Sequence, residues 1–142
     1  MSRLKIFLFI FILAFIACNK EQSNEPISEL PGMYESNRFI EPGSADGGVN
    51  ILSSGGHLRI TFDDDFIFHS ELFIPQAAAS NYPQGYTHYD GSFSIMDQTI
   101  KFDSANFFLD SIRWEPESKK LETFEVSPRG QPFKIILYKS SR

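Results

Sequence analysis

The amino-acid sequence contains very little cysteine, because Cys18 is the single cysteine among 142 residues. A lone cysteine excludes a disulfide within the chain, so the folded part must be stabilised by its apolar core. Basic residues are also scarce, with 13 Lys and Arg against 18 Asp and Glu. Nucleic-acid affinity comes mostly from basic side chains that neutralise phosphates, so this charge balance excludes a nucleic-acid partner.

The sequence also lacks the short motifs of common catalytic sites. It contains no nucleophile elbow, no phosphate-binding glycine loop and no His-Glu-x-x-His pattern. Serines and carboxylates are plentiful, so counting them neither supports nor excludes a catalytic triad. We therefore identify no catalytic residue, and we predict neither an enzymatic activity nor a cofactor.

An apolar leader occupies the first 17 residues, where the segment from Ile6 to Ala17 is almost wholly apolar and follows two basic residues. A charged start, an apolar core of about 7–15 residues and small residues at the exit are typical of a secretory signal, which is too short to span a bilayer. The residues Phe15-Ile16-Ala17-Cys18 at its end resemble the signal peptide of bacterial lipoproteins. In that family a bulky apolar residue, a second residue and Ala or Gly precede a lipidated cysteine.

The resemblance implies that residues 1–17 are removed and that Cys18 receives a diacylglycerol thioether and an acylated amino group. Two or three acyl chains together anchor a protein firmly to a membrane, whereas a single chain holds weakly. By the same resemblance, Asn19 in place of an aspartate favours the outer membrane of a Gram-negative envelope, on either its periplasmic or its surface side. The alternative is an uncleaved anchor or an ordinary secretory signal.

The rest of the chain is expected to be a tether and one all-β domain. Residues 18–29 are polar and acidic and cannot form a core, so we expect a flexible tether. In residues 30–142, short apolar segments about 8–12 residues apart indicate an antiparallel meander of about eight strands, in a barrel or a β-sandwich. The predicted strands are Met33–Ile40, Val49–Ser53, His57–Phe62, Phe66–Ile74, Thr87–Ile95, Thr99–Asp103, Phe107–Trp114, Lys120–Val126 and Phe133–Lys139.

The two ends of this domain carry a further resemblance. The opening Leu30-Pro31-Gly32-Met33-Tyr34 and the closing Ile135-Ile136-Leu137-Tyr138-Lys139 are similar to the small lipocalin-like domains of bacterial lipoproteins, whose first strand begins Gly-x-Trp or Gly-x-Tyr. The resemblance implies a closed or nearly closed barrel that holds a small apolar ligand. The alternative is a structural or protein-interaction module of the cell envelope with a filled barrel.

The choice between these two functions depends on where the large aromatic side chains point. An eight-stranded barrel is just wide enough to hold one small ligand or to be filled by its own side chains. If most of a set of five phenylalanines point inward, the lumen is full; these are Phe62, Phe93, Phe102, Phe124 and Phe133.

The stretch Pro75–Tyr89 is the candidate for contact with a ligand or partner, because it contains the longest break between predicted strands. Tyr82, Tyr86, His88 and Tyr89 combine apolar bodies with polar tips, as side chains at binding surfaces do. The alternative is a connection that covers one end of the barrel, with its tyrosines packed down.

The three histidines raise the question of a metal site. His69 and Glu71 have the spacing that places two ligands on one face of a strand, and together with Asp63–Asp65 they are the best candidate set. We favour a surface histidine beside a carboxylate and a hairpin turn at the three aspartates, so we predict no metal.

Overall fold

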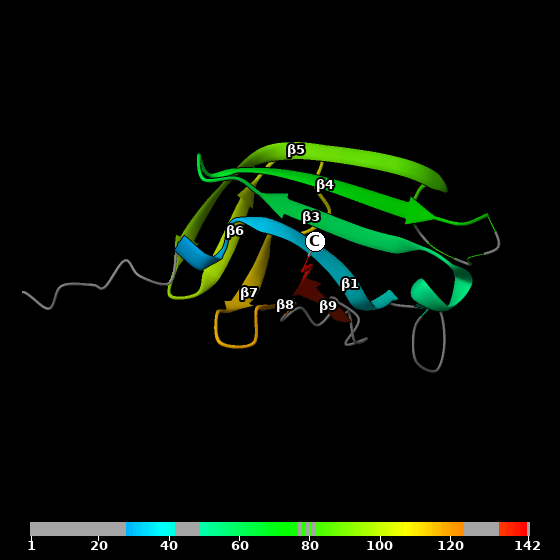
Figure 1. Cartoon of the computed structure of the whole chain (residues 1–142). Coiled ribbons are helices and arrows are strands. Elements are labelled where there is room, and N and C mark those ends of the chain that lie inside the picture. The colour runs from blue at the N-terminus through cyan, green and yellow to red at the C-terminus, as the bar shows by residue number, and fades with distance from the viewer. Residues whose placement is uncertain are drawn as a thin grey trace, which may run out of the picture.

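A computed structural model of the chain describes residues 28–41, 49–76, 78, 80, 82–123 and 134–141 (Figure 1). Cys18, the leader, most of the tether, Phe124 and Phe133 lie outside these described residues. Within the described residues, no helix is long and apolar enough to cross a membrane.

The described chain forms one antiparallel sheet that closes into a barrel. The strands are β1 (Gly32–Glu41), β2 (Val49–Asn50), β3 (His57–Phe62), β4 (Ile67–Ile74), β5 (Gly85–Met96), β6 (Thr99–Asp103), β7 (Ser111–Glu115), β8 (Lys120–Glu122) and β9 (Lys134–Lys139). From β3 to β9 each strand pairs with the next along the chain, β1 pairs with β3, and pairing of β1 with β9 closes the ring. The two-residue strand β2 is an addition to the edge of β1. The prediction of a closed all-β barrel is therefore confirmed, and the sandwich alternative is wrong.

Alternation of apolar and polar residues sets the faces of the strands. In β3, Leu58, Ile60 and Phe62 are buried, while the residues between them are only partly buried. The same alternation holds along β4 from Phe68 to Ile74 and in β9 at Ile135 and Leu137. Because side chains point to opposite faces with a period of two, one residue in two lines the barrel interior.

Two predicted strands are wrong in part. Only Val49–Asn50 of the segment Val49–Ser53 is a strand, and Leu52–Ser54 is a 3-10 helix. The Asn50 side-chain oxygen accepts a hydrogen bond from the Leu52 N–H at 3.1 Å, so a local side-chain bond replaces the strand ladder. In the segment Phe107–Trp114, the strand begins only at Ser111. A turn precedes it, in which the Phe107 N–H donates a hydrogen bond to the Ser104 carbonyl.

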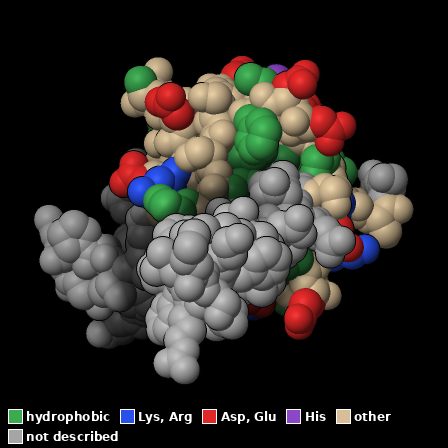
Figure 2. Space-filling model, turned by 90° about the vertical axis from the view of Figure 1, so that its left-hand side faces the viewer, with side chains coloured by type: hydrophobic (Ala, Val, Ile, Leu, Met, Phe, Trp, Pro, Cys, Tyr) green, Lys and Arg blue, Asp and Glu red, His purple; other side chains and the backbone are tan. Residues whose placement is uncertain are grey.

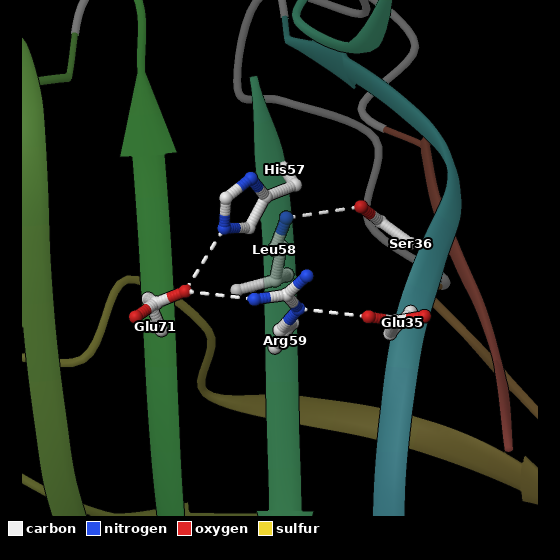
Figure 3. Close-up of polar contacts among 6 residues, drawn as sticks. All are labelled: Glu35, Ser36, His57, Leu58, Arg59 and Glu71. Carbon is white, nitrogen blue, oxygen red and sulfur yellow. Dashed lines mark hydrogen bonds and ion pairs between the residues drawn. The ribbon is translucent and has the colours of Figure 1, made fainter. Parts of the chain in front are cut away.

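A β-bulge lies in β1, the strand that pairs with both β3 and β9 and so closes the barrel. The register between β1 and β9 shifts between Ser36 and Arg38, so Tyr34 and Phe39 both point inward although they are five positions apart. Pairing of β1 with β3 ends at Glu35. One step farther along, the Leu58 N–H donates to the Ser36 hydroxyl at 2.9 Å instead of to a backbone carbonyl (Figure 3).

The two ends of the barrel differ. At one end lie the short connections 63–66, 97–98 and 116–119 together with residues 28–31 (Figure 1). The C-terminal end of the described chain joins them, because the Ser140 N–H donates to the Met33 carbonyl at the start of β1. We call this the turn end. The opposite end, where β1 ends at Glu41 and β4 ends at Ile74, is the loop end. Any segment N-terminal to Ser28 therefore joins the barrel at its turn end.

Candidate functional site

The four residues of the predicted contact loop do not form one surface. β5 begins at Gly85, two residues earlier than expected, so Tyr86 lies on the strand together with His88 and Tyr89. The alternation along β5 leaves Tyr86 and His88 exposed and turns Tyr89 toward the interior. Tyr82 and Tyr89 both pack against the ring of Phe108, with centroid distances of 5.0 and 5.9 Å. Of these four residues, only Tyr82 therefore lies in the connection before β5, and their contact with a ligand or partner stays a prediction.

A continuous set of aromatic rings lies in the lumen of the described barrel. Phe62 lies 4.9 Å from Phe93 between ring centroids, and Phe68 lies 4.8 Å from Phe102 and 4.9 Å from Phe107. Phe102 also contacts Phe62 and Phe107, so the five rings are linked from the turn end toward the loop end. Of the five phenylalanines on which the choice of function depends, Phe62, Phe93 and Phe102 therefore face the interior.

Gly91 is the residue that makes room for this packing. It is paired with Phe68 across β4 and β5. A Cβ atom at this position would lie 2.6 Å from the Asp103 carbonyl oxygen and 2.9 Å from the ring of Phe68. The aromatic side chain therefore lies directly against backbone, which only glycine permits at this site.

The loop end of the interior is less uniformly apolar. Phe39 and Phe108 stack there with centroids 6.1 Å apart. Glu41 is only 2 % exposed, and the Ser80 hydroxyl donates a hydrogen bond to its carboxylate at 2.6 Å. Deeper in the lumen, the hydroxyl of the buried Ser70 has no hydrogen-bond partner within the described part of the chain. This end therefore combines aromatic rings with a few polar groups.

The outward side chains of β3, β4 and β5 form a second candidate site, which we call the β3–β5 face. All three histidines of the chain lie on it. His57, Phe73 and Tyr86 occupy one row across the three strands, where the ring centroids of Phe73 and Tyr86 are 4.5 Å apart. Because Tyr86 remains 62 % exposed, this row presents a supported aromatic surface to solvent.

The next row of the β3–β5 face is a chain of charged groups (Figure 3). Arg59 lies between two carboxylates, with its Nε 2.8 Å from Glu35 Oε1 and its Nη1 3.3 Å from Glu71 Oε1. His57 Nε2 contacts the same Glu71 oxygen at 2.9 Å. The hydrogen bond from His57, aided by the charge of Arg59, lowers the pKa of the Glu71 carboxyl group. The Glu71 carboxylate is therefore shared by Arg59 of its own row and His57 of the neighbouring row.

A shallow groove of about 240 Å³ runs along this row and the one below it. Within the groove, His69 Nε2 lies 3.3 Å from Asp63 Oδ2, and its Nδ1 contacts Asp90. The hydrogen bond to Asp90 raises the pKa of His69, and the charge of Asp63 adds to this effect. The groove is lined by Met33, Arg59, Thr61, His69, Ser70, Glu71, His88 and Asp90.

The structure separates the two residues of the candidate metal pair, His69 and Glu71. His69 contacts Asp63 and Asp90, whereas Glu71 contacts His57 and Arg59. Among the described residues, no group of three or more His, Cys, Asp or Glu side chains is arranged to hold a metal ion. Asp63–Asp65 lie in the turn between β3 and β4, where the Asp63 N–H donates to the Ile67 carbonyl at 2.9 Å.

The β3–β5 face was not identified from the sequence, although the signal for it is present. The alternation in His57–Phe62 already places His57, Arg59 and Thr61 on the outer side of their strand. The short turn after Phe62 then fixes the register that sets Arg59 opposite Glu71.

Comparisons with protein-family models, with curated proteins and with solved structures found no match to this chain.

Proposed function

We propose that this chain is a lipid-anchored lipoprotein of the bacterial cell envelope whose filled barrel presents the β3–β5 face to a protein partner. The anchor is supported by the sequence Phe15-Ile16-Ala17-Cys18 and by the polar tether that follows it. The outer membrane of a Gram-negative envelope is the location that Asn19 favours. A non-enzymatic interaction module of this kind needs no cofactor and no open lumen.

The observation that carries the proposal is the packing of the lumen. Phe62, Phe68, Phe93, Phe102 and Phe107 are in mutual ring contact along the described part of the barrel axis. A barrel of eight strands has room for its own side chains or for a ligand, but not for both. Binding is therefore expected on the outside of the barrel.

The β3–β5 face has the composition of a protein-binding surface. Tyrosine and arginine are enriched in the residues that contribute most to protein–protein affinity, and this face carries both, as Tyr86 and Arg59. The ring of Tyr86 is held by Phe73 and His57, so a partner can bury it without first ordering it. Arg59 is held by Glu35 and Glu71 in the same way.

Photo-crosslinking in living cells tests the interaction. A photoreactive amino acid in place of Tyr86 should give a defined adduct of higher mass, whereas the same residue in place of Ser94, an exposed position on the same strand, should give none. Charge reversal of Arg59 to Glu should reduce the Tyr86 adduct. An adduct pattern that is the same at both positions, or no adduct at either, contradicts the proposal.

Labelling with radioactive palmitate tests the anchor separately. The full chain should incorporate the label, and the variant Cys18→Ser should not. Because Cys18 is the only cysteine, the variant removes every thiol from the protein, and the comparison is direct. Labelling that is equal in the two proteins, or absent from both, contradicts the lipid anchor.

A second candidate function is the binding of a small amphipathic ligand at the loop end of the lumen. Ser70 favours it, because its hydroxyl is buried without a hydrogen-bond partner in the described chain and so could receive one from a ligand. Phe108 and Tyr82, which are only partly buried, would contact the apolar part. Native mass spectrometry before and after organic extraction should reveal a released mass if this function holds, and an unchanged mass otherwise.

A further inference from the structure

The place at which the tether joins the barrel determines which end lies closer to the anchor along the chain. The described chain begins with Ser28 at the turn end (Figure 1). Residues 18–27, ten in number, separate Cys18 from this point. Even when fully extended at about 3.6 Å per residue, they span only about 35 Å. Leu30 is 1 % exposed and its carbonyl accepts a hydrogen bond from the Tyr34 hydroxyl, so the point of attachment is fixed.

Exposed apolar side chains gather at the same end. Phe66 is 44 % exposed in the β3–β4 turn, Ile67 is 39 % exposed at the start of β4, and Met96 is 59 % exposed at the end of β5. Figure 2 shows this end of the molecule, where hydrophobic side chains are visible among Asp and Glu side chains. Tyr86 is the large exposed aromatic residue that lies near the loop end instead.

The backbone of Phe66 is in a strained conformation. Its φ angle is 60°, in the left-handed region that glycine and asparagine adopt easily and a bulky aromatic residue does not. Its carbonyl accepts a hydrogen bond from the Phe93 N–H at 2.9 Å, which holds the residue in place. Its ring packs against Phe93 with centroids 5.5 Å apart, yet the residue remains 44 % exposed, so burial offsets the strain only in part. Strain of this kind is typical of positions that serve a function.

We infer that the turn end is a bilayer-contact surface, with Phe66, Ile67 and Met96 in the headgroup region of the membrane that holds the lipid anchor. The inference rests on the anchor of the proposed function, and it assigns an orientation that the anchor alone does not. The β3–β5 row of Tyr86 and the loop end then point away from the membrane.

The charges around this surface select the type of lipid. Asp63, Asp64 and Asp65 directly precede Phe66, and Asp97 directly follows Met96. These carboxylates are repelled by anionic headgroups over about 10 Å at ordinary ionic strength. The surface is therefore suited to zwitterionic headgroups, and contact should weaken when anionic lipid is added.

The experiment uses the full lipidated chain in phosphatidylcholine vesicles that contain a lipid-borne fluorescence quencher. Asp65→Cys places a fluorescent reporter beside Phe66, and Ser53→Cys places the same reporter in the 3-10 helix at the loop end. Cys18 does not compete for the label because its sulfur carries lipid. Quenching at position 65 should exceed quenching at position 53 by about threefold or more, since lipid quenchers act over short distances and the barrel keeps the two ends apart.

The role of the aromatic ring is tested in the Asp65→Cys background. Phe66→Asn places a residue that tolerates positive φ at this position. It should lower the ratio of anchored barrels in contact with the bilayer to anchored barrels away from it by about fivefold, because apolar surface is lost from the contact. Tyr86→Asn, which removes an exposed ring near the other end, should leave this ratio unchanged. Met96→Ser provides a second variant in case Phe66→Asn alters the turn, and it should lower the ratio in the same direction. Phosphatidylglycerol should reduce quenching at position 65, and added salt should restore it.

The outcomes distinguish this inference from the anchor on which it rests. Equal quenching at positions 65 and 53 in a palmitate-labelled protein overturns the bilayer contact and leaves the anchor intact. Loss of quenching by Tyr86→Asn to the same extent as by Phe66→Asn also overturns it. Absence of palmitate from the preparation overturns both proposals together.

Discussion

Replacing Phe68 by alanine should open space in the lumen for an apolar molecule. Phe68 is fully buried, and its ring lies against Phe102 and Phe107 at centroid distances of 4.8 and 4.9 Å. Loss of a buried Phe side chain costs about 3–5 kcal/mol, which includes the transfer of the ring and the cavity that it leaves. Since a domain of this size has a free energy of unfolding of about 5–15 kcal/mol, the variant should fold but melt about 10–25 °C lower.

Unfolding can be followed by the fluorescence of Trp114, which is the single tryptophan and is 1 % exposed. Benzene should raise the melting temperature of Phe68→Ala and leave that of the wild-type protein unchanged, because an apolar cavity stays dry and binds such molecules. Phe68→Leu is the control, with a smaller loss and a weaker response to benzene. If benzene stabilises the wild-type protein as much as the variant, or if Phe68→Ala costs less than about 1 kcal/mol, the lumen is not filled as described.

Three further predictions follow from positions outside the aromatic set. Gly91→Ala should lower the free energy of unfolding by about 1–3 kcal/mol in denaturant titrations, because a Cβ atom would lie 2.6 Å from the Asp103 carbonyl oxygen. Ser92→Ala, on the exposed side of β5, is the control and should change the free energy of unfolding by less than about 0.5 kcal/mol. Gln98→Gly should stabilise the protein by about 0.5–1 kcal/mol, because Gln98 has a φ of 63° in the two-residue turn between β5 and β6; an unchanged or lower stability contradicts this reasoning. His69 has a raised pKa in the folded protein, so its stabilisation is fully present below the unfolded value of about 6.5 and is lost as the pH rises through the folded pKa. His69→Gln should therefore lower the free energy of unfolding more at about pH 5 than at about pH 8. Because the ring is 53 % exposed, the loss should stay below about 1 kcal/mol and shrink in salt. An equal loss of stability at both pH values contradicts this reasoning.

The strands of the barrel were largely predictable because their alternation is a local property. Leu58, Ile60 and Phe62 identify the inner face of β3 without any knowledge of its partners. The turn at Asp97 and Gln98 was likewise predictable, because polar residues there separate the predicted strands Thr87–Ile95 and Thr99–Asp103, which pair in the structure.

The sequence was less informative where side chains compete with the backbone or where distant strands meet. At Asn50, a side-chain hydrogen bond ends β2 after two residues, although Ile51 and Leu52 continue an apolar run. At Gly85, pairing with Ile74 extends β5 beyond the alternation that is visible in the sequence. The division of the tyrosines into inner and outer positions follows from that pairing, which is a tertiary effect and not a local preference.

The candidate site was the least predictable part of the molecule. Arg59 and Glu71 are ordinary charged residues in sequence, and their contact follows from the register of one hairpin. The pairing of His69 with Asp90 requires the next hairpin as well. Such groups are recognised only after the strands have been placed side by side.

The pairing of β1 with β9 has a consequence for the time course of folding. Tyr34 and Lys139 are neighbours in the barrel, although nearly the whole domain separates them in sequence. Contacts of such high contact order form slowly, so the ring should close in milliseconds to seconds or later, after the local hairpins. Until the last strand arrives, β1 and β8 expose unpaired backbone that attracts other chains. A newly synthesised molecule is therefore most vulnerable to aggregation before its C-terminal strand is in place, and a chaperone that shields strand edges would act in that interval.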